Sequence, residues 1–446
     1  MASPGTTHHS GRFGFLAGLR SVATGVLGAG LLTYLFLSLA GRILGPARFA
    51  PVSTLWALVF IIGPGIFVPL QQELGRVIAA QRAERGGGTA VRRASQLTAG
   101  VGVVTLLAGV AASRWLVDQL FEGQWALFWC FEGAVLAYAI TYLVRGVLSG
   151  LGDFADFGRL VAYESVARLL IAGILVALGI RSAAAFGAAI AIAPLLSCGW
   201  VTRMGRRLRL TAGTPAAWRE LTRAFGWLVT GSLFAQFLAN AGPLAVQLLA
   251  TSSQHAEAGR FLSALVIARI SLYLFQAVQA TILPNLAELA AQRRTTELRA
   301  AIRRLTLACL VLIVASTVGA FLLGPLAVRI LFGADFAITA RTMAILAAAS
   351  AIYVLAAALN GASIAAASHR LTAGCWVVGC VVFGLGTLLS HDLFLRVELG
   401  YLLGSCAAVV VLLIGLPASI RRHDADPVDA GAPFEDLPGA SGPGPG

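Results

Sequence analysis

Apolar runs of about 20 residues, divided by short polar stretches, follow one another along almost the whole chain. A run of this length is what an α-helix needs to cross the hydrocarbon core of a bilayer. The pattern therefore predicts twelve membrane-spanning helices. They are placed at residues 17–40, 50–70, 95–113, 125–145, 160–180, 183–202, 224–249, 261–283, 304–323, 339–359, 371–390 and 397–417.

The composition of the chain agrees with this pattern. Of its 446 residues, 58% are hydrophobic and only 12% are charged, whereas about 25% of the residues in a typical soluble domain are charged. So little polar surface cannot cover twelve apolar helices in water. The expected fold class is an all-α membrane protein.

The second half of the chain repeats sequence features of the first half, about 211 residues later. The matching pairs are Arg48-Phe49 with Arg260-Phe261, Leu120-Phe121 with Leu331-Phe332, Leu148 with Leu359, Gly150 with Gly361, Arg159 with Arg370, and Leu160 with Leu371. Six spans per repeat is an even number, so the two repeats cross the membrane in the same direction. Two parallel six-helix repeats around a central cavity are typical of transporters, which rock one repeat against the other.

The spans and the repeats divide the chain into five expected segments. These are a cytoplasmic N-terminal tail at 1–16, an N-terminal six-helix bundle at 17–202, a cytoplasmic linker at 203–223, a C-terminal six-helix bundle at 224–417 and a disordered cytoplasmic tail at 418–446. The last segment is rich in Asp, Pro and Gly, a composition that does not bury a core.

The basic residues set the expected orientation. All 33 of them are arginine, and most fall in loops that face the cytoplasm if the N-terminus is cytoplasmic. This bias follows the positive-inside rule and predicts that both termini lie on the cytoplasmic side of the membrane. The net charge of +13 is then a topology signal and not the footprint of a nucleic acid, because the arginines are spread over many short loops.

Sequence features of enzymes are missing. The chain has no phosphate-binding glycine loop, no metal-ligand spacing and no nucleophile triad, and its six cysteines are isolated within spans. The loops expected outside are too short for an extracytoplasmic catalytic domain. We expect no enzymatic activity, no cofactor and no bound metal.

Charged residues inside the spans are the first candidates for function, because charges are costly in a bilayer and usually face a cavity or a partner. Glu132, Glu164, Arg168 and Arg269 are placed there, whereas Arg145 is placed near a cytoplasmic membrane surface. Arg168 is about 13 Å deep at ~1.5 Å per residue, and Glu164 precedes it by one helical turn. Two interpretations stay open. The two residues form a local ion pair that packs the bundle, or Arg168 faces the cavity and Glu164 or Glu132 tunes its charge.

Amide side chains form a second candidate group, in spans seven and eight. Its members are Gln236, Asn240 and Gln247 on one face of span seven, and Tyr273, Gln276 and Gln279, which share a stripe with Arg269 in span eight. Amides and an arginine suit hydrogen bonds to sugar hydroxyls and pairing with phosphate. The alternative is hydrogen bonding between packed helices. A third feature, Gly63-Pro64-Gly65 in span two, predicts a kink that is either a hinge or a static bend.

The chain resembles the polysaccharide-transporter branch of the multidrug/oligosaccharidyl-lipid/polysaccharide flippase superfamily, the group that contains O-antigen flippases. The motifs that carry the resemblance are Gly41-Arg42-Ile43-Leu44-Gly45-Pro46-Ala47-Arg48-Phe49, Gly259-Arg260-Phe261 with Pro284, and Leu148-Ser149-Gly150. The resemblance implies a twelve-span transporter that moves polyprenyl-pyrophosphate-linked oligosaccharide to the outer leaflet. It implies as partners this lipid-linked substrate, the membrane lipids, and a polysaccharide polymerase or glycosyltransferase.

Rival functions are a drug/cation antiporter or a peptidoglycan-precursor flippase of the same superfamily, and a scaffold for a polysaccharide synthase. The antiporter branch typically has an acidic residue in an early span, and the first span here has none. The peptidoglycan branch usually has two further C-terminal spans. The charges inside the spans count against a scaffold.

Overall fold

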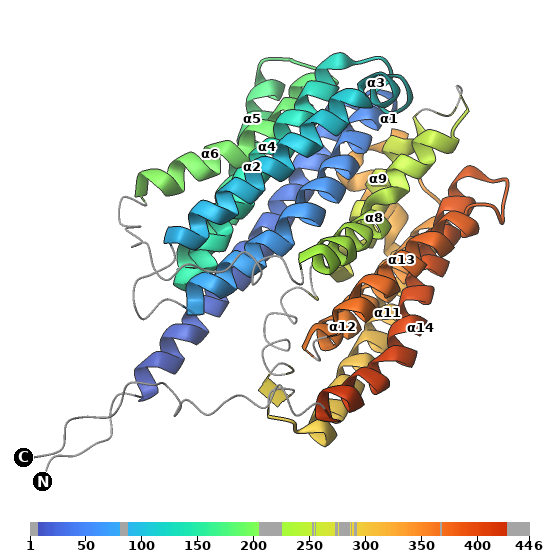
Figure 1. Ribbon diagram of the computed structural model, residues 1–446. Helices are drawn as coiled ribbons and strands as arrows, with labels where there is room; N and C mark the ends of the chain where they lie inside the picture. The colour runs from blue at the N-terminus through green and yellow to red at the C-terminus, as the bar shows by residue number, and fades with distance from the viewer. Residues whose placement is uncertain are drawn as a thin grey trace, which may run out of the picture.

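The computed structural model describes residues 8–80, 88–204, 225–251, 254, 256–272, 275, 286, 288–289, 292–365 and 368–425. Within these residues the protein is built from helices and contains no strand. Figure 1 shows the helices of the first half (blue to green) beside those of the second half (yellow to red). Both α1 and α14 have their chain-terminal ends at the same end of the molecule, called the terminal end below; the opposite end is the distal end.

The first repeat consists of long helices joined by short connections. They are α1 (His8–Ala80), α2 (Gly88–Ala111), α4 (Trp125–Leu151), α5 (Phe154–Ala177) and α6 (Ala183–Met204), with the short α3 (Ser113–Leu120) at the distal end. Helix α1 supplies the first two spans, because its backbone leaves the helical region at Gly45, where φ is 72° and ψ is 168°. Glycine adopts this positive φ without strain, and Pro46 disfavours helical geometry at the residue before it.

The second repeat has the same order of spans. Its elements are α8 (Phe225–Leu249), α9 (Glu257–Ala268), α11 (Thr295–Phe332), the 3₁₀ turn η3 (Ala334–Phe336), α12 (Ala340–Ala365), α13 (His369–Gly386) and α14 (Leu393–Ala425). Helix α9 begins the eighth expected span. Most of the remaining residues of that span lie outside the described part of the chain.

Helix lengths agree with a membrane protein. In the described residues, nine helices are long and apolar enough to cross a membrane, with the two spans of α1 counted once, and Arg370–Gly386 is a shorter apolar helix. Large apolar side chains such as Val311 and Leu322 on α11 are more than half exposed, as expected of a surface that faces lipid.

Helix ends differ from the expected segment boundaries. Helix α1 begins at His8, within the segment expected to be a tail, and α14 continues to Ala425, past the expected end of the second bundle at residue 417. Hydropathy marks the part of a helix that lies in hydrocarbon, whereas the hydrogen-bonded helix continues beyond it into the polar flanks.

Helix α1 is in contact with both repeats. It packs against α4 and α5 in its own repeat and against α8 and α9 in the other. The contact with α4 is close enough to require glycine: a Cβ on Gly150 would lie 2.6 Å from the Cβ of Ile78 and 2.9 Å from the carbonyl oxygen of Gly75. Small residues at such crossings let membrane helices approach until their backbones touch.

Candidate functional site

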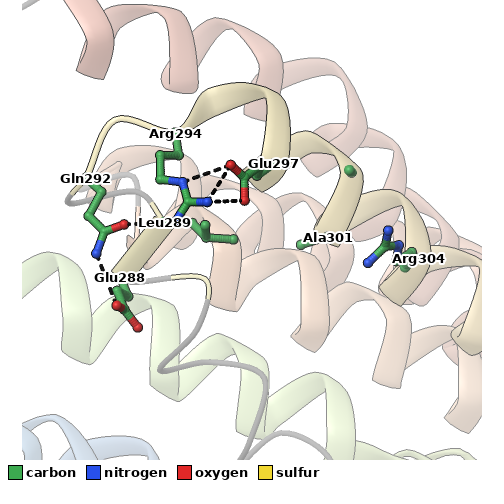
Figure 2. A pocket seen from close by; sticks show the side chains of 8 residues that line it. Glu288, Leu289, Gln292, Arg294, Glu297, Ala301 and Arg304 are labelled. Atoms are coloured by element: carbon green, nitrogen blue, oxygen red, sulfur yellow. Dashed lines mark hydrogen bonds and ion pairs between the residues drawn. The ribbon is translucent and has the colours of Figure 1, made fainter.

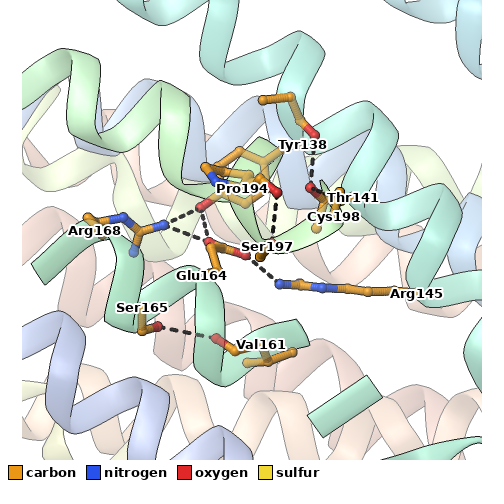
Figure 3. Close-up of polar contacts among 11 residues, drawn as sticks. Tyr138, Thr141, Arg145, Val161, Glu164, Ser165, Arg168, Pro194, Ser197 and Cys198 are labelled. Carbon is orange, nitrogen blue, oxygen red and sulfur yellow. Dashed lines mark hydrogen bonds and ion pairs between the residues drawn. The ribbon is translucent and has the colours of Figure 1, made fainter. Parts of the chain in front are cut away.

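Glu164 and Arg168 lie on one face of α5 and form a buried ion pair. Nη2 of Arg168 donates to Oε1 of Glu164 at 2.6 Å and to the hydroxyl of Tyr138 on α4 at 2.9 Å. The Tyr138 hydroxyl in turn donates to the same carboxylate oxygen at 2.7 Å (Figure 3). Arg168 is only 1% exposed. Of the two interpretations of this pair, the observed geometry is the local one, with Arg168 enclosed by protein.

Arg145 completes the cluster, although the sequence analysis placed it near the membrane surface. Its Nη2 donates to Oε2 of Glu164 at 2.7 Å, and its side chain is 12% exposed (Figure 3). One carboxylate therefore pairs with two guanidinium groups, which leaves the cluster with one net positive charge. The signal was present in the sequence: Tyr138, Tyr142 and Arg145 follow at i, i+4 and i+7, on one face of α4.

Two aromatic rings of α1 cover the other side of Arg168. The guanidinium carbon lies 5.3 Å from the ring centroid of Trp56 and 5.9 Å from that of Phe36. Cation–π contacts of this kind stabilise a guanidinium that has lost its water. The cluster thus joins α1, α4 and α5 in the middle of the first repeat.

Glu132 does not belong to this cluster. It lies on α4 against Gly109 of α2, so close that a Cβ on Gly109 would lie 1.7 Å from its Oε1. The residue is 2% exposed, and within the described part of the chain neither carboxylate oxygen has a hydrogen-bond partner. One of the two interpretations in the sequence analysis named Glu164 or Glu132 as the residue that tunes the charge of Arg168. In the structure the groups that do so are Glu164 and Tyr138.

Arg269 lies in the second repeat and is paired quite differently. It follows the last residue of α9, and its Nη1 donates to Oδ1 of Asn240 on α8 at 3.0 Å. The Asn240 amide donates to the carbonyl oxygen of Gln236 at 3.0 Å and to its side-chain oxygen at 3.2 Å. The structure therefore brings together three of the residues that the sequence analysis selected.

The guanidinium of Arg269 keeps unused donors. Its Nε and Nη2 are buried, and neither has a hydrogen-bond partner in the described residues, where no acidic side chain forms an ion pair with it. An arginine offers five N–H donors and is always charged. Arg269 is thus a partly buried cation whose described partners are neutral.

The remaining predicted residues are placed as follows. Gln247 is buried on α8, nearer the distal end than Asn240. Tyr273, Gln276 and Gln279 lie outside the described residues.

The Gly63-Pro64-Gly65 segment is part of an unbroken helix in this conformation. In α1 only Gly45 has non-helical backbone angles. The segment is instead a contact between repeats: the Ser232 hydroxyl donates to the carbonyl oxygen of Pro64 at 3.4 Å, and a Cβ on Gly65 would lie 2.9 Å from Cδ1 of Leu233. Its function as a hinge stays a prediction.

A polar pocket of about 390 Å³ lies at the terminal end, where α11 begins (Figure 2). Arg294 forms a bidentate ion pair with Glu297. Its Nε donates to Oε1 at 2.8 Å, and its Nη2 donates to Oε2 at 2.6 Å. Gln292 connects this pair to Glu288. Because acidic and basic groups alternate around this pocket, its charge favours neither anions nor cations.

Comparison with known proteins gives relatives along nearly the full length. The chain is 27% identical over 399 residues to the uncharacterized protein Rv1510 of Mycobacterium tuberculosis, which covers 88% of this chain and 89% of that one. It is 24% identical over 404 residues to the uncharacterized protein Rv3630 of the same species, covering 89% and 91%. No family model matches the chain.

Solved structures of similar fold are transporters. One is the inward-facing conformation of a multidrug resistance MATE family transporter of the MOP superfamily, with a TM-score of 0.67 at 15% identity, covering 89% of this chain and 95% of that one. The outward-facing conformation of a transporter with the same description has a TM-score of 0.62 at 15% identity, covering 92% and 95%. The MATE fold has twelve helices in two repeats. The prediction of an all-α membrane protein with two six-helix repeats is therefore confirmed.

Proposed function

We propose that this protein is a transporter that flips a lipid-linked oligosaccharide, carried on a polyprenyl pyrophosphate, from the inner to the outer leaflet of a bacterial plasma membrane. The fold supports transport, because the similar structures are of MATE family transporters. The choice of substrate rests on the charge of the second repeat.

Arg269 is the observation that carries the proposal. Its side chain is partly buried, and removing a charge from water without a counter-charge is unfavourable, so a ligand that supplies the missing partner would be bound favourably. Nε and Nη2 of Arg269, which have no hydrogen-bond partner among the described residues, form the fork that binds phosphate oxygens in pairs. Asn240 and Gln236 extend this fork with amides that suit sugar hydroxyls. Gln247, Tyr273, Gln276 and Gln279 are assigned to the same sugar-binding stripe.

The cluster in the first repeat adds positive charge to the same molecule. Arg145 and Arg168 share one carboxylate, so the cluster keeps a net positive charge inside the first repeat. In this conformation Trp56 covers Arg168. Movement of α1 would uncover it, and the Arg168 guanidinium would then be a second attachment point for the pyrophosphate.

Alternating access is the proposed mechanism. At the distal end α1 contacts α11 and η3 of the second repeat, whereas at the terminal end the ribbon of α1 leads away from α11 and α14 (Figure 1). The anionic head group would enter between the repeats from the terminal end, on the cytoplasmic side. Its polyprenyl chain would stay in lipid, and a polymerase or glycosyltransferase would use the sugar after release.

A drug/cation antiporter is the second candidate, and Glu132 is the observation that favours it. A buried carboxylate whose two oxygens have no partner in the described residues is suited to bind a proton or a small cation. Glu132 lies against α2, apart from Arg269 and Asn240, so the two functions depend on different residues.

The experiment is to deplete the protein in its host and to measure the leaflet distribution of lipid-linked oligosaccharide. The flippase proposal expects accumulation in the cytoplasmic leaflet, rescued by the wild-type protein and not by Arg269→Gln. Arg329→Gln on α11, an exposed arginine of the same repeat, is the control and is expected to rescue. An unchanged distribution together with new sensitivity to cationic drugs would favour the antiporter.

A further inference from the structure

A groove of about 500 Å³ runs along the second repeat between α11, α12 and α14. Arg299, Arg303 and Arg421 line its rim at the terminal end. Its interior is lined by apolar side chains, together with Thr306: Ile302, Leu307, Leu359, Leu413, Leu416, Pro417 and Ile420. Among the described residues, none of those that line it is acidic.

The three arginines are free to bind an external anion. All three are exposed, and in the described part of the chain none of them forms an ion pair or a hydrogen bond with another residue. Arg304 provides a contrast one position further along α11: it lines the neighbouring pocket, whose wall includes Glu288 and Glu297. The described lining of the groove is thus basic and apolar, whereas that of the neighbouring pocket contains both acidic and basic side chains.

The depth of the arginines matches the head-group region of a bilayer. Arg299 and Arg303 lie in the first turns of α11, and Arg421 lies near the end of α14. Apolar side chains follow at once toward the middle of the membrane. Leu359, Leu416 and Ile420 form a buried floor, whereas Leu307 and Leu413 are 55% and 49% exposed and open the groove to lipid.

We infer that this groove is a binding site for one anionic phospholipid, with the phosphate held by Arg299, Arg303 and Arg421 and an acyl chain lying on the floor. Basic pockets between membrane helices recognise anionic head groups by this combination of charge and apolar contact. A free phosphate would use the arginines alone and leave the apolar floor uncovered. The residues that line the groove belong to α11, α12 and α14, and none of them is among the residues assigned above to substrate binding.

The test is lipid binding to the purified full chain in nanodiscs of phosphatidylcholine with increasing phosphatidylglycerol, followed by native mass spectrometry and thermal stability. A ligand that binds only the folded state raises its stability. We expect retention of phosphatidylglycerol and a rise in the midpoint of thermal unfolding. Replacement of the three groove arginines by Gln should weaken retention at least tenfold. The matched control, Arg92→Gln, Arg304→Gln and Arg370→Gln together, removes the same charge from exposed positions outside the groove and should leave retention unchanged.

A second variant separates the lipid from its phosphate. Thr306→Trp fills the groove and keeps all three arginines, so it should also lower retention of phosphatidylglycerol. Equal loss in the groove and control triple variants would overturn the site, as would full retention in Thr306→Trp or displacement of the lipid by millimolar inorganic phosphate. None of these measurements involves transport, so their outcome is independent of the flippase proposal.

Discussion

The Nε atom of Arg42 donates a 2.7 Å hydrogen bond to the backbone carbonyl oxygen of Leu331, and thereby joins the first repeat to the last turn of α11 in the second. The same guanidinium also donates to the carbonyl oxygen of Ile330. These carbonyls end a helix, where backbone acceptors lack partners within the helix and the helix dipole favours a cation. Arg42 therefore closes the distal end of the contact between the repeats.

Aromatic packing surrounds this hydrogen bond. The ring of Phe49 lies 6.3 Å from that of Phe332 and 6.0 Å from that of Phe336. A Cβ on Gly259 would lie 2.5 Å from the carbonyl oxygen of Pro46, so the backbones of α9 and α1 are in contact at this point. If the repeats rock, these are the contacts that must separate when the distal end opens.

Arg42→Gln should shift the protein toward a state that is open at the distal end. A hydrogen bond to a charged group contributes about 1.5–3 kcal/mol, enough to change the ratio of two states about tenfold or more. The measurement is the rate at which a polar maleimide modifies Phe49→Cys, in a chain whose six native cysteines are replaced by alanine. Faster labelling in the Arg42→Gln background is expected. Arg48→Gln is the control, because Arg48 is exposed and makes no such bond in the described residues. Equal labelling in both backgrounds would contradict the assigned closure.

Glu164→Gln should destabilise the first repeat strongly. The substitution leaves Arg145 and Arg168 buried without their counter-charge, and the loss of one partner of a buried ion pair costs about 3–5 kcal/mol. Glu297→Gln, which breaks the exposed pair with Arg294, should cost no more than about 1 kcal/mol. The comparison is made by thermal unfolding of the two purified variants in the same detergent. Similar midpoints would show that the buried cluster does not hold α4 to α5.

Gly150→Ala should disturb the crossing of α1 and α4, because the added methyl group meets Ile78 and the carbonyl of Gly75 at less than 3 Å. The added methyl group would force the backbones of α1 and α4 apart. A lower yield of folded protein and a lower midpoint of thermal unfolding are therefore expected. Gly173→Ala on α5 adds the same methyl group in open space and is expected to be neutral or slightly stabilising. The monodisperse fraction on size-exclusion chromatography reports both. Normal folding of Gly150→Ala would mean that the two helices are not in this contact.

Glu132→Gln should leave flipping of the lipid-linked substrate unchanged, because Glu132 lies against Gly109 and away from Arg269. The measurement is transport by the reconstituted variant with and without an imposed proton or sodium gradient. Loss of flipping in this variant would contradict the expectation and would show that transport of the lipid-linked substrate requires the Glu132 carboxylate. Loss of cation-driven drug export would instead support the antiporter.

The sequence was sufficient to predict the all-α membrane fold with two repeats, because apolar length and repeated motifs are read along the chain. It was not sufficient to predict the neighbours of the charges inside the spans. Arg145 appeared close to the membrane surface when counted along span four, yet the rotation of α4 turns it toward Glu164. Glu132, on the same helix, is turned toward α2. The rotation of each helix depends on packing against the others, which a single sequence does not display.

The position at which the helical backbone of α1 is interrupted was also difficult to predict from the sequence. Gly63-Pro64-Gly65 has the composition of a kink, and its backbone angles are helical in this conformation. The break occurs at Gly45, where the residue before a proline and a positive φ coincide. For Gln236 and Asn240 the helical spacing was informative, since the two residues lie four apart on α8 and are hydrogen-bonded to each other, and Asn240 also accepts from Arg269.

The most direct test of the central claim is the flipping rate of a fluorescent polyprenyl-pyrophosphate monosaccharide in liposomes that contain purified protein. Wild-type protein and the Arg329→Gln control should flip this lipid at the same rate, and Arg269→Gln should be at least tenfold slower while folding normally. Arg269→Lys, which keeps the charge and loses the two-pronged donor, should lie between them. Equal rates for Arg269→Gln and wild-type protein would contradict the assignment of Arg269 as the pyrophosphate-binding residue.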